Sequence, residues 1–259
     1  MFEVAEAYEV MMGRWSRQLA QLFVGFAGVR DGDIVLDVGC GTGALSATLA
    51  RLTGASKIVG IDPSTGFIEY ARTQVTDPRV TFELADAQDL PYSDGSFDRC
   101  MALLIVNFVP DAPKAANEMC RVTKPGGVVA TTMWEGSRAH QLAGCFWDAA
   151  VVVDPTAKRP AERRGSYGSA AALSDLWKGA GLTEIEVTDL TMPCQFSSFG
   201  DYWLPVREGQ GPSGAYLACL SEDQQAALRE QLRQNLFGTR ADGPFTLQAK
   251  AWAAKGIVP

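Results

Sequence analysis

Residues 34–43, IVLDVGCGTG, decide the fold of this chain. An apolar strand runs into a glycine-rich turn, and the next segment, residues 44–52, has the apolar spacing of a helix. Glycines let the backbone of such a turn approach a ligand closely, and the first amides of the following helix are available to bind it. The stretch therefore predicts an α/β fold with a ligand at the end of the first strand.

Strand-like and helix-like segments alternate after this turn. Short apolar runs predict further strands at residues 57–61, 80–84, 99–104, 127–133, 184–188 and 245–252. Helical spacing predicts helices at residues 64–74, 113–122, 170–180 and 222–236. Strands separated by helices of this length form parallel βαβ units. We expect an α/β, doubly wound, mostly parallel seven-stranded sheet with helices on both faces, an antiparallel last strand and helical lid insertions.

The chain of 259 residues, 47% of them apolar, is long enough to bury one large core, so residues 1–259 are expected to form a single domain. Residues 1–30 would form an amino-terminal lid and a helix, and residues 31–134 the ligand-binding core. Two stretches outside the alternation, residues 135–167 and 199–237, follow strands and would cover the substrate at the carboxyl edge of the sheet.

Apolar residues recur at helical steps between residues 4 and 26. Gly13 interrupts this pattern, and Ser16 is placed to cap a second helix. The segment is therefore predicted to be a short lid helix followed by a helix that packs on the sheet.

Three acids stand at the ends of the first three predicted strands. Asp37 precedes the first glycine of the turn, where it would repel a pyrophosphate but attract an ammonium or sulfonium group. Asp62 ends the second strand, where a carboxylate can accept hydrogen bonds from two ribose hydroxyls. Asp86 follows the third strand and is placed to accept one from an adenine amino group. Together they favour S-adenosylmethionine as the ligand.

A nicotinamide or flavin nucleotide is the alternative ligand of the turn. Gly39, Gly41 and Ala44 also satisfy a loose GxGxxA dinucleotide pattern, and a ribose contact by Asp62 would suit either ligand. An NAD-type oxidoreductase and a non-catalytic binding module with the same pocket are therefore the competing interpretations.

The chain resembles the class I, Rossmann-like S-adenosylmethionine-dependent methyltransferases, particularly the group of ubiquinone and menaquinone biosynthesis C-methyltransferases. The motifs LDVGCGTG, GIDPS, ADAQDLPYSDGSFD and RVTKPGGVV, between about Asp33 and Trp134, carry this resemblance. It implies methyl transfer from S-adenosylmethionine, with S-adenosylhomocysteine as the product. Beyond Trp134 we recognise no motif that identifies the methyl acceptor.

The resemblance also implies a set of cofactor contacts. The first motif would surround the methionine part, the second the ribose and the third the adenine, and a backbone carbonyl at the end of the fourth strand would receive the methionine ammonium. The residues concerned are Asp37, Gly39, Cys40, Gly41, Asp62, Pro63, Asp86, Ala87, Gln88 and Leu103, with Tyr8 and Arg14 in the lid.

The acceptor side of the site is less defined. His140, the only histidine, and Asn107 lie just after predicted strands and are candidate catalytic residues. Aromatic side chains in and near the two insertions are candidates for a substrate pocket, namely Trp134, Trp147, Tyr202 and Trp203. Since no general base stands out, the methylated atom is left open.

Composition restricts the partners. The formal net charge is −7 without a dense basic block, which disfavours nucleic acid and favours a small-molecule acceptor. Six scattered cysteines and one histidine suggest neither a metal site nor a disulfide framework. Residues 1–10, MFEVAEAYEV, lack a basic region followed by an apolar stretch, and no apolar run approaches about 20 residues. We therefore expect a cytoplasmic protein without membrane contact, as a monomer or homodimer.

Overall fold

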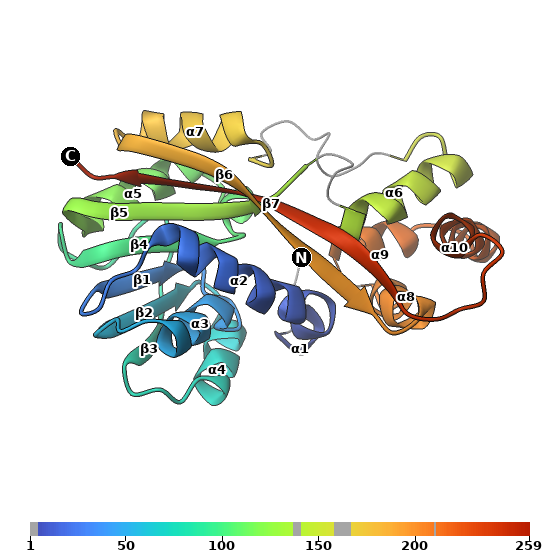
Figure 1. Cartoon of the computed structure of the whole chain (residues 1–259), viewed down its shortest axis with the longest axis horizontal. Helices are drawn as coiled ribbons and strands as arrows, with labels where there is room; N and C mark the ends of the chain where they lie inside the picture. The colour runs from blue at the N-terminus through green and yellow to red at the C-terminus, as the bar shows by residue number, and fades with distance from the viewer. Residues whose placement is uncertain (1–4, 137–140, 158–166, 210) are drawn as a thin grey trace.

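The computed structural model describes residues 5–136, 141–157, 167–209 and 211–259 (Figure 1). One seven-stranded sheet has the order β3-β2-β1-β4-β5-β7-β6. Its strands are β1 (Ile34–Val38), β2 (Lys57–Asp62), β3 (Val80–Leu84), β4 (Phe97–Leu103), β5 (Thr123–Trp134), β6 (Thr183–Phe196) and β7 (Phe245–Ile257). Strand β7 runs antiparallel to both neighbours, whereas the pairs among β1 to β5 are parallel. The predicted fold class is thereby confirmed.

Helices cover both faces of the sheet (Figure 1). They are α1 (Ala5–Tyr8), α2 (Arg14–Ala27), α3 (Ala44–Leu52), α4 (Thr65–Gln74), α5 (Ala112–Val122), α6 (Gln141–Val153), α7 (Ala170–Gly179), α8 (Phe199–Arg207), α9 (Gly211–Leu217) and α10 (Glu222–Phe237). A π-helical turn, Glu9–Gly13, joins α1 to α2, and a 3-10 turn, Val106–Phe108, follows β4. None of the helices in these described stretches is long and apolar enough to cross a membrane.

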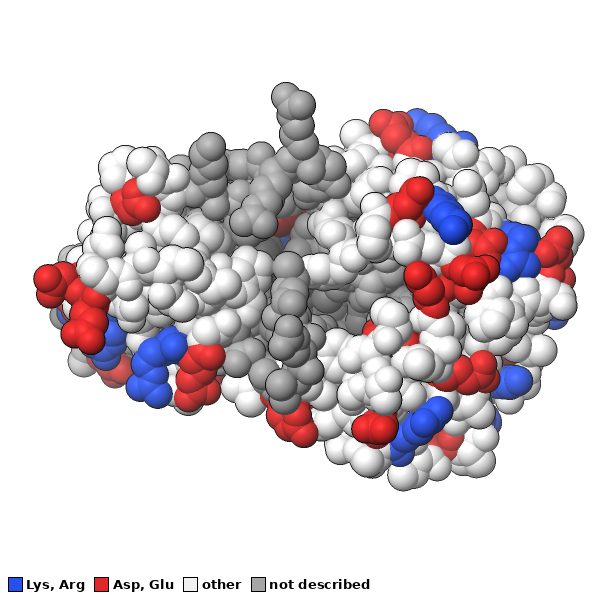
Figure 2. Space-filling view, turned by 180° about the vertical axis from the view of Figure 1, so that it is seen from behind, with Lys and Arg blue, Asp and Glu red and all other residues white. Residues whose placement is uncertain are grey.

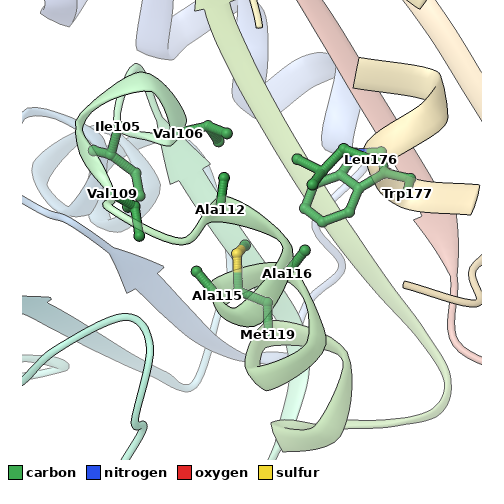
Figure 3. A pocket seen from close by; sticks show the side chains of 9 residues that line it. All are labelled: Ile105, Val106, Val109, Ala112, Ala115, Ala116, Met119, Leu176 and Trp177. Atoms are coloured by element: carbon green, nitrogen blue, oxygen red, sulfur yellow. The ribbon is translucent and has the colours of Figure 1, made fainter. Parts of the chain in front are cut away.

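Two apolar clusters fix the helices to the sheet. Leu19 and Phe23 of α2 and Leu45 of α3 pack on one face. Met119 of α5 and Trp177 of α7 pack on the other. Between α5 and α7 a hollow of about 10 Å³ remains, lined by apolar side chains only (Figure 3). It belongs to this second cluster.

Strands β6 and β7 reach beyond the rest of the sheet and carry a second lobe, formed by α6, α8, α9 and α10 (Figure 1). Strand β5 ends at the pair Trp134 with Ala251, whereas β7 stays paired with β6 as far as Phe245. The free edge of β7 is covered there, because the Glu135 amide donates to the Lys250 carbonyl (2.9 Å) and the Gln248 amide to the Gln141 side chain (2.8 Å).

Strands β6 and β7 are longer than the segments 184–188 and 245–252 that the sequence predicts. Met192, Cys194 and Phe196 are buried in strict alternation with exposed neighbours, so β6 continues past the predicted end. Pro193 lies inside this extension. Since β6 is the edge strand of the sheet, a residue without an amide proton is tolerated there.

The prediction that Gly13 interrupts the amino-terminal helix is wrong. Gly13 has helical dihedral angles, φ −53° and ψ −46°, and the chain continues through the π turn directly into α2. A Cβ atom at this position would meet only the carboxylate end of the Glu9 side chain, which would have to shift. Ser16 is no cap either, since it lies inside α2 and its hydroxyl bonds to the Tyr8 hydroxyl at 2.7 Å.

We predict that Leu19→Ala lowers the free energy of unfolding by about 2–5 kcal/mol, because it opens a cavity in a fully buried position of α2. Leu22→Ala on the same helix is the matched control. Its side chain is 40% exposed, so the change should stay within about 0.5 kcal/mol. Urea titration measures both, and equal losses would show that α2 does not pack as described.

Candidate cofactor and acceptor site

The glycine-rich turn lies where the strand order reverses, between β1 and β4. Gly39 adopts a left-handed φ of +69°, and a Cβ atom there would press on Ile105 in the loop after β4. Gly41 also has a positive φ, +52°, but a Cβ atom there would meet no atom within 4 Å. Crevices at such reversal points bind ligands in open α/β sheets. The turn is thus packed on one side and open on the other.

Asp62 joins this turn to the end of β2. One carboxylate oxygen accepts the Gly41 amide at 3.1 Å, and the other accepts the Ser64 amide at 2.9 Å. The residue is only 8% exposed, and burial raises the pKa of its carboxyl group although both amides oppose the shift. Pro63 follows it and is exposed. A carboxylate with two occupied oxygens keeps further lone pairs for ribose hydroxyls.

Asp37 lies beneath the turn, fully buried. Its Oδ2 accepts a hydrogen bond from the Ser46 hydroxyl of α3 at 2.7 Å, whereas its Oδ1 and the hydroxyl of Thr42 have no partner among the described residues. Burial raises the pKa of Asp37 to about 7. Burial also raises the pKa of the neighbouring Cys40 thiol, which disfavours its thiolate form. Two buried polar groups beside the turn therefore lack a hydrogen-bond partner, which a polar ligand would supply.

The residues after β3 form a polar corner at the start of α5. The exposed Asp86 carboxylate accepts the Gln88 backbone amide at 2.8 Å, and the Gln88 side-chain oxygen accepts the Asp111 amide at 3.0 Å. Ala87 between them is buried. These bonds tie the loop after β3 to the start of α5, and the Asp86 carboxylate remains accessible for an amino group.

The end of β4 is strained. Leu104 has a φ of +66°, a conformation that is rare for residues other than glycine, and its amide donates to the Thr132 carbonyl of β5 at 2.9 Å. Leu103 before it is buried. Such strain persists where surrounding contacts enforce it and is frequent at binding sites.

The amino-terminal helix brings Tyr8 to the cofactor side. The Tyr8 ring lies edge-on against Phe67 of α4, with ring centroids 6.0 Å apart. Burial raises the pKa of Tyr8, and the negative charges of Glu9 and Asp62 add to the shift. Arg14, by contrast, is engaged by Asp201 of α8 at 3.0 Å. The two predicted lid residues therefore lie against different parts of the molecule.

Asn107 anchors the chain segment that returns from the insertion 135–167. Its side-chain oxygen accepts the Tyr167 amide at 2.7 Å, and the Gly136 amide donates to the Gly168 carbonyl at 3.0 Å nearby. Trp134 ends β5 at this point and is half-buried. His140 lies outside the described residues, so its predicted role stays a prediction.

The other predicted substrate residues lie inside the second lobe. Trp147 packs against Phe146 and Tyr216, with centroids 5.3 and 5.2 Å away. The Tyr202 hydroxyl donates to a backbone carbonyl at 3.1 Å, and Trp203 stacks on Phe199 at 6.0 Å. Trp147, Tyr202 and Trp203 are each at most 7% exposed. In this structure they form the core of the lobe, and contact with an acceptor stays a prediction.

Several residues of the site escaped the sequence analysis. Ser46 is signalled only by its place in the first turns of α3, on the side that faces β1. Ile105 and Tyr167 carry no motif of their own. Asp201 is 187 residues from its partner Arg14, and no local pattern connects such positions.

The molecular surface shows mixed charge. On the face in Figure 2, lysine and arginine side chains lie next to aspartate and glutamate side chains and are separated by uncharged residues. The described residues on this face therefore offer a polyanion no continuous basic strip.

Comparisons with known proteins agree with this geometry. Residues 36–131 match the family model of a methyltransferase domain. Methyltransferase GfsG of Streptomyces halstedii is 46% identical over 106 residues, 39% of this chain and 38% of that protein. The 2-methyl-6-phytyl-1,4-hydroquinone methyltransferase of Synechocystis sp. is 33% identical over 186 residues, 70% of this chain and 56% of that protein. The chain thus spans about two fifths to just over half the length of these relatives.

A solved structure extends the likeness to the whole fold. Phosphoethanolamine N-methyltransferase 2 of Haemonchus contortus, in complex with phosphomonomethylethanolamine and S-adenosylhomocysteine, aligns with a TM-score of 0.59 and 21% identity. The alignment covers 98% of this chain and 57% of that one. At this identity the likeness shows the fold.

We predict that Asp37 makes stability depend on pH. Because its pKa rises from 3.8 to about 7 in the folded chain, the native state binds a proton that the unfolded state has lost between these values. The free energy of unfolding should therefore fall with rising pH across this window, by at most about 1.4 kcal/mol per pH unit. Asp37→Asn should flatten the profile from urea titrations at pH 4.5 to 7.5.

The control is Asp175→Asn, which removes a carboxylate whose side chain is 74% exposed on α7. It should leave the slope of the wild-type profile in place. Identical profiles for the two variants would contradict the role of the buried carboxyl group.

Proposed function

Because this chain carries a methyltransferase domain with the class I, Rossmann-like fold, we propose that it transfers a methyl group from S-adenosylmethionine to a small organic molecule and releases S-adenosylhomocysteine. The observation that carries the proposal is the bond from the Gly41 amide to the buried Asp62 carboxylate, beside the open side of the turn. It joins the two motifs that would hold the methionine and ribose parts of one ligand.

The described residues fit this cofactor. The backbone of Gly39 and Gly41 would hold its methionine part, and Asp62 would accept its ribose hydroxyls. Asp86 would accept the adenine amino group, with Gln88 fixing the Asp86 side chain. In its ionised form, Asp37 with its unpartnered oxygen beneath the turn adds negative potential where positive ligand groups would lie.

The chemistry of the step is a displacement at carbon. S-adenosylmethionine supplies an electrophilic methyl group, which leaves its sulfonium and forms a bond to the acceptor. The protein would hold the acceptor nucleophile in line with that bond and exclude water. An acceptor that carries a proton on the reacting atom must also lose it. Asn107, as an amide already bonded to Tyr167, suits positioning of the loop and not proton removal.

Two observations support a small acceptor. The Synechocystis relative is named for a hydroquinone substrate, and it aligns with 70% of this chain. The mixed charges of the face in Figure 2 do not favour a polyanionic partner. All six cysteines are free thiols. A cytoplasmic location and an assembly as monomer or homodimer remain our expectations.

An NAD-type oxidoreductase is the competing function. Its pyrophosphate would have to lie on the turn above Asp37, whose ionised carboxylate repels it. Calorimetry with S-adenosylhomocysteine and with NADH separates the two functions. A non-catalytic module would bind the former and transfer no methyl group.

We predict that Asp62→Ala weakens S-adenosylhomocysteine binding by about 1.5–3 kcal/mol, because it removes hydrogen bonds to a charged acceptor. Glu69→Ala, an exposed acid on the neighbouring α4, is the control and should bind like the wild type. Isothermal titration calorimetry measures both. Unchanged affinity of the Asp62 variant would exclude the ribose contact.

We predict further that labelled methyl groups from S-adenosylmethionine appear in the small-molecule fraction of a cell extract supplied with the protein. The Asp62→Ala variant at the same concentration should give a weaker signal. Label confined to RNA, DNA or protein would refute the small acceptor, and no label in any fraction would favour the non-catalytic module.

A further inference from the structure

An ion pair connects the amino-terminal helix to the second lobe. The two terminal nitrogens of Arg14 face the two carboxylate oxygens of Asp201, at 3.2 and 3.0 Å. The guanidinium group also lies over the rings of Trp15 and Phe196, 4.2 and 4.9 Å from their centroids. A two-pronged pair with stacked rings is more directional than an ordinary surface salt bridge.

Groups other than Arg14 also hold Asp201 in place. Its carboxylate accepts the Ser197 amide at 3.0 Å, and its own amide donates to the Ser198 hydroxyl that caps α8, at 3.2 Å. Although burial opposes ionisation, the hydrogen bonds from Arg14 and Ser197 keep the pKa of Asp201 below its usual value. Asp201 is therefore a fixed negative charge in the first turn of α8.

Tyr8 at the end of α1 and Arg14 at the start of α2 belong to one continuous helical segment, joined by the π turn. Two further contacts secure the start of α2 against β6, namely Trp15 with Phe196 at 5.2 Å and the Gln18 side chain with the Pro193 carbonyl at 3.1 Å. Residues 5–13 precede this anchored point without a break in helical structure. Any displacement of Arg14 would therefore move the Tyr8 end.

We propose that Asp201, acting through Arg14, is a positioning residue for the cofactor site, because it holds residues 5–13 in place, with Tyr8 against Phe67 of α4, the helix that follows Asp62. The inference rests on the proposed function, since the site it acts on is that of S-adenosylmethionine. It couples the second lobe to cofactor binding. Arg14 then acts through its helix and not by touching the carboxylate of the methionine part.

Two ligands and four variants test this proposal. S-adenosylhomocysteine and 5′-methylthioadenosine share adenine and ribose, but only the first has the amino acid carboxylate. Asp201→Asn, Arg14→Gln and the double variant should each weaken both ligands by about three- to tenfold, the double no more than either single one. Arg233→Gln, which breaks a pair with Glu230 within α10, is the control and should change neither affinity.

Other outcomes overturn the proposal. If Arg14→Gln weakens S-adenosylhomocysteine alone while Asp201→Asn tightens it, Arg14 binds the ligand carboxylate directly. If the variants lower the melting temperature but leave both affinities and the dissociation rates in stopped-flow fluorescence unchanged, the pair only stabilises the fold.

A ligand-free readout separates this proposal from the proposed function. In the absence of ligand, amides of residues 5–13 should exchange hydrogen faster in Asp201→Asn than in the wild type, and should be unaffected by Arg233→Gln. Unchanged exchange overturns the inference. If the wild type binds neither ligand, the proposed function fails, and the exchange experiment still decides whether Asp201 holds this segment.

Discussion

The bond between the Gly41 amide and the Asp62 carboxylate is the contact on which the rest of the site depends. It forces the turn after β1 towards the end of β2, while Gly39 keeps the other side of that turn against Ile105 after β4. Both contacts require β1 to lie between β2 and β4, which the strand order provides. Removing water from a carboxylate is costly, and two backbone amides offset that cost here.

The second lobe is continuous with the sheet. One apolar cluster runs from Leu19 of α2 through Trp15 to Phe196 at the end of β6, and on to Phe199 and Trp203 of α8. The long β6 and β7 strands supply the backbone link and α2 supplies the side-chain link. Since α2 also touches α3, which follows the glycine-rich turn, the lobe and the cofactor side share one packed helix.

Interactions between residues that are close in the sequence could be predicted from it, and those between distant residues could not. The turn and Asp62 were predictable because each belongs to a strand end with a local pattern of apolar residues and glycine. The predicted strand 184–188 stops short of Pro193, although β6 continues through it. A proline is tolerated there because β6 is an edge strand, and only the assembled sheet reveals that position. Trp147 and Tyr202 gave no sign whether they face a ligand or the core of the lobe. The pairing of Arg14 with Asp201 depends on the tertiary fold alone.

The π turn at Glu9–Gly13 has a consequence for comparing this chain with others of its fold. Successive residues of an α-helix are rotated by about 100° around its axis, so one surplus residue changes the direction of everything before it. The wide turn absorbs such a residue and leaves Tyr8 directed at Phe67. In a homologue without the turn, the side chain that occupies this place would stand at a different distance along the sequence. Equivalent residues of this segment are therefore identified by direction in space and not by counting back from α2.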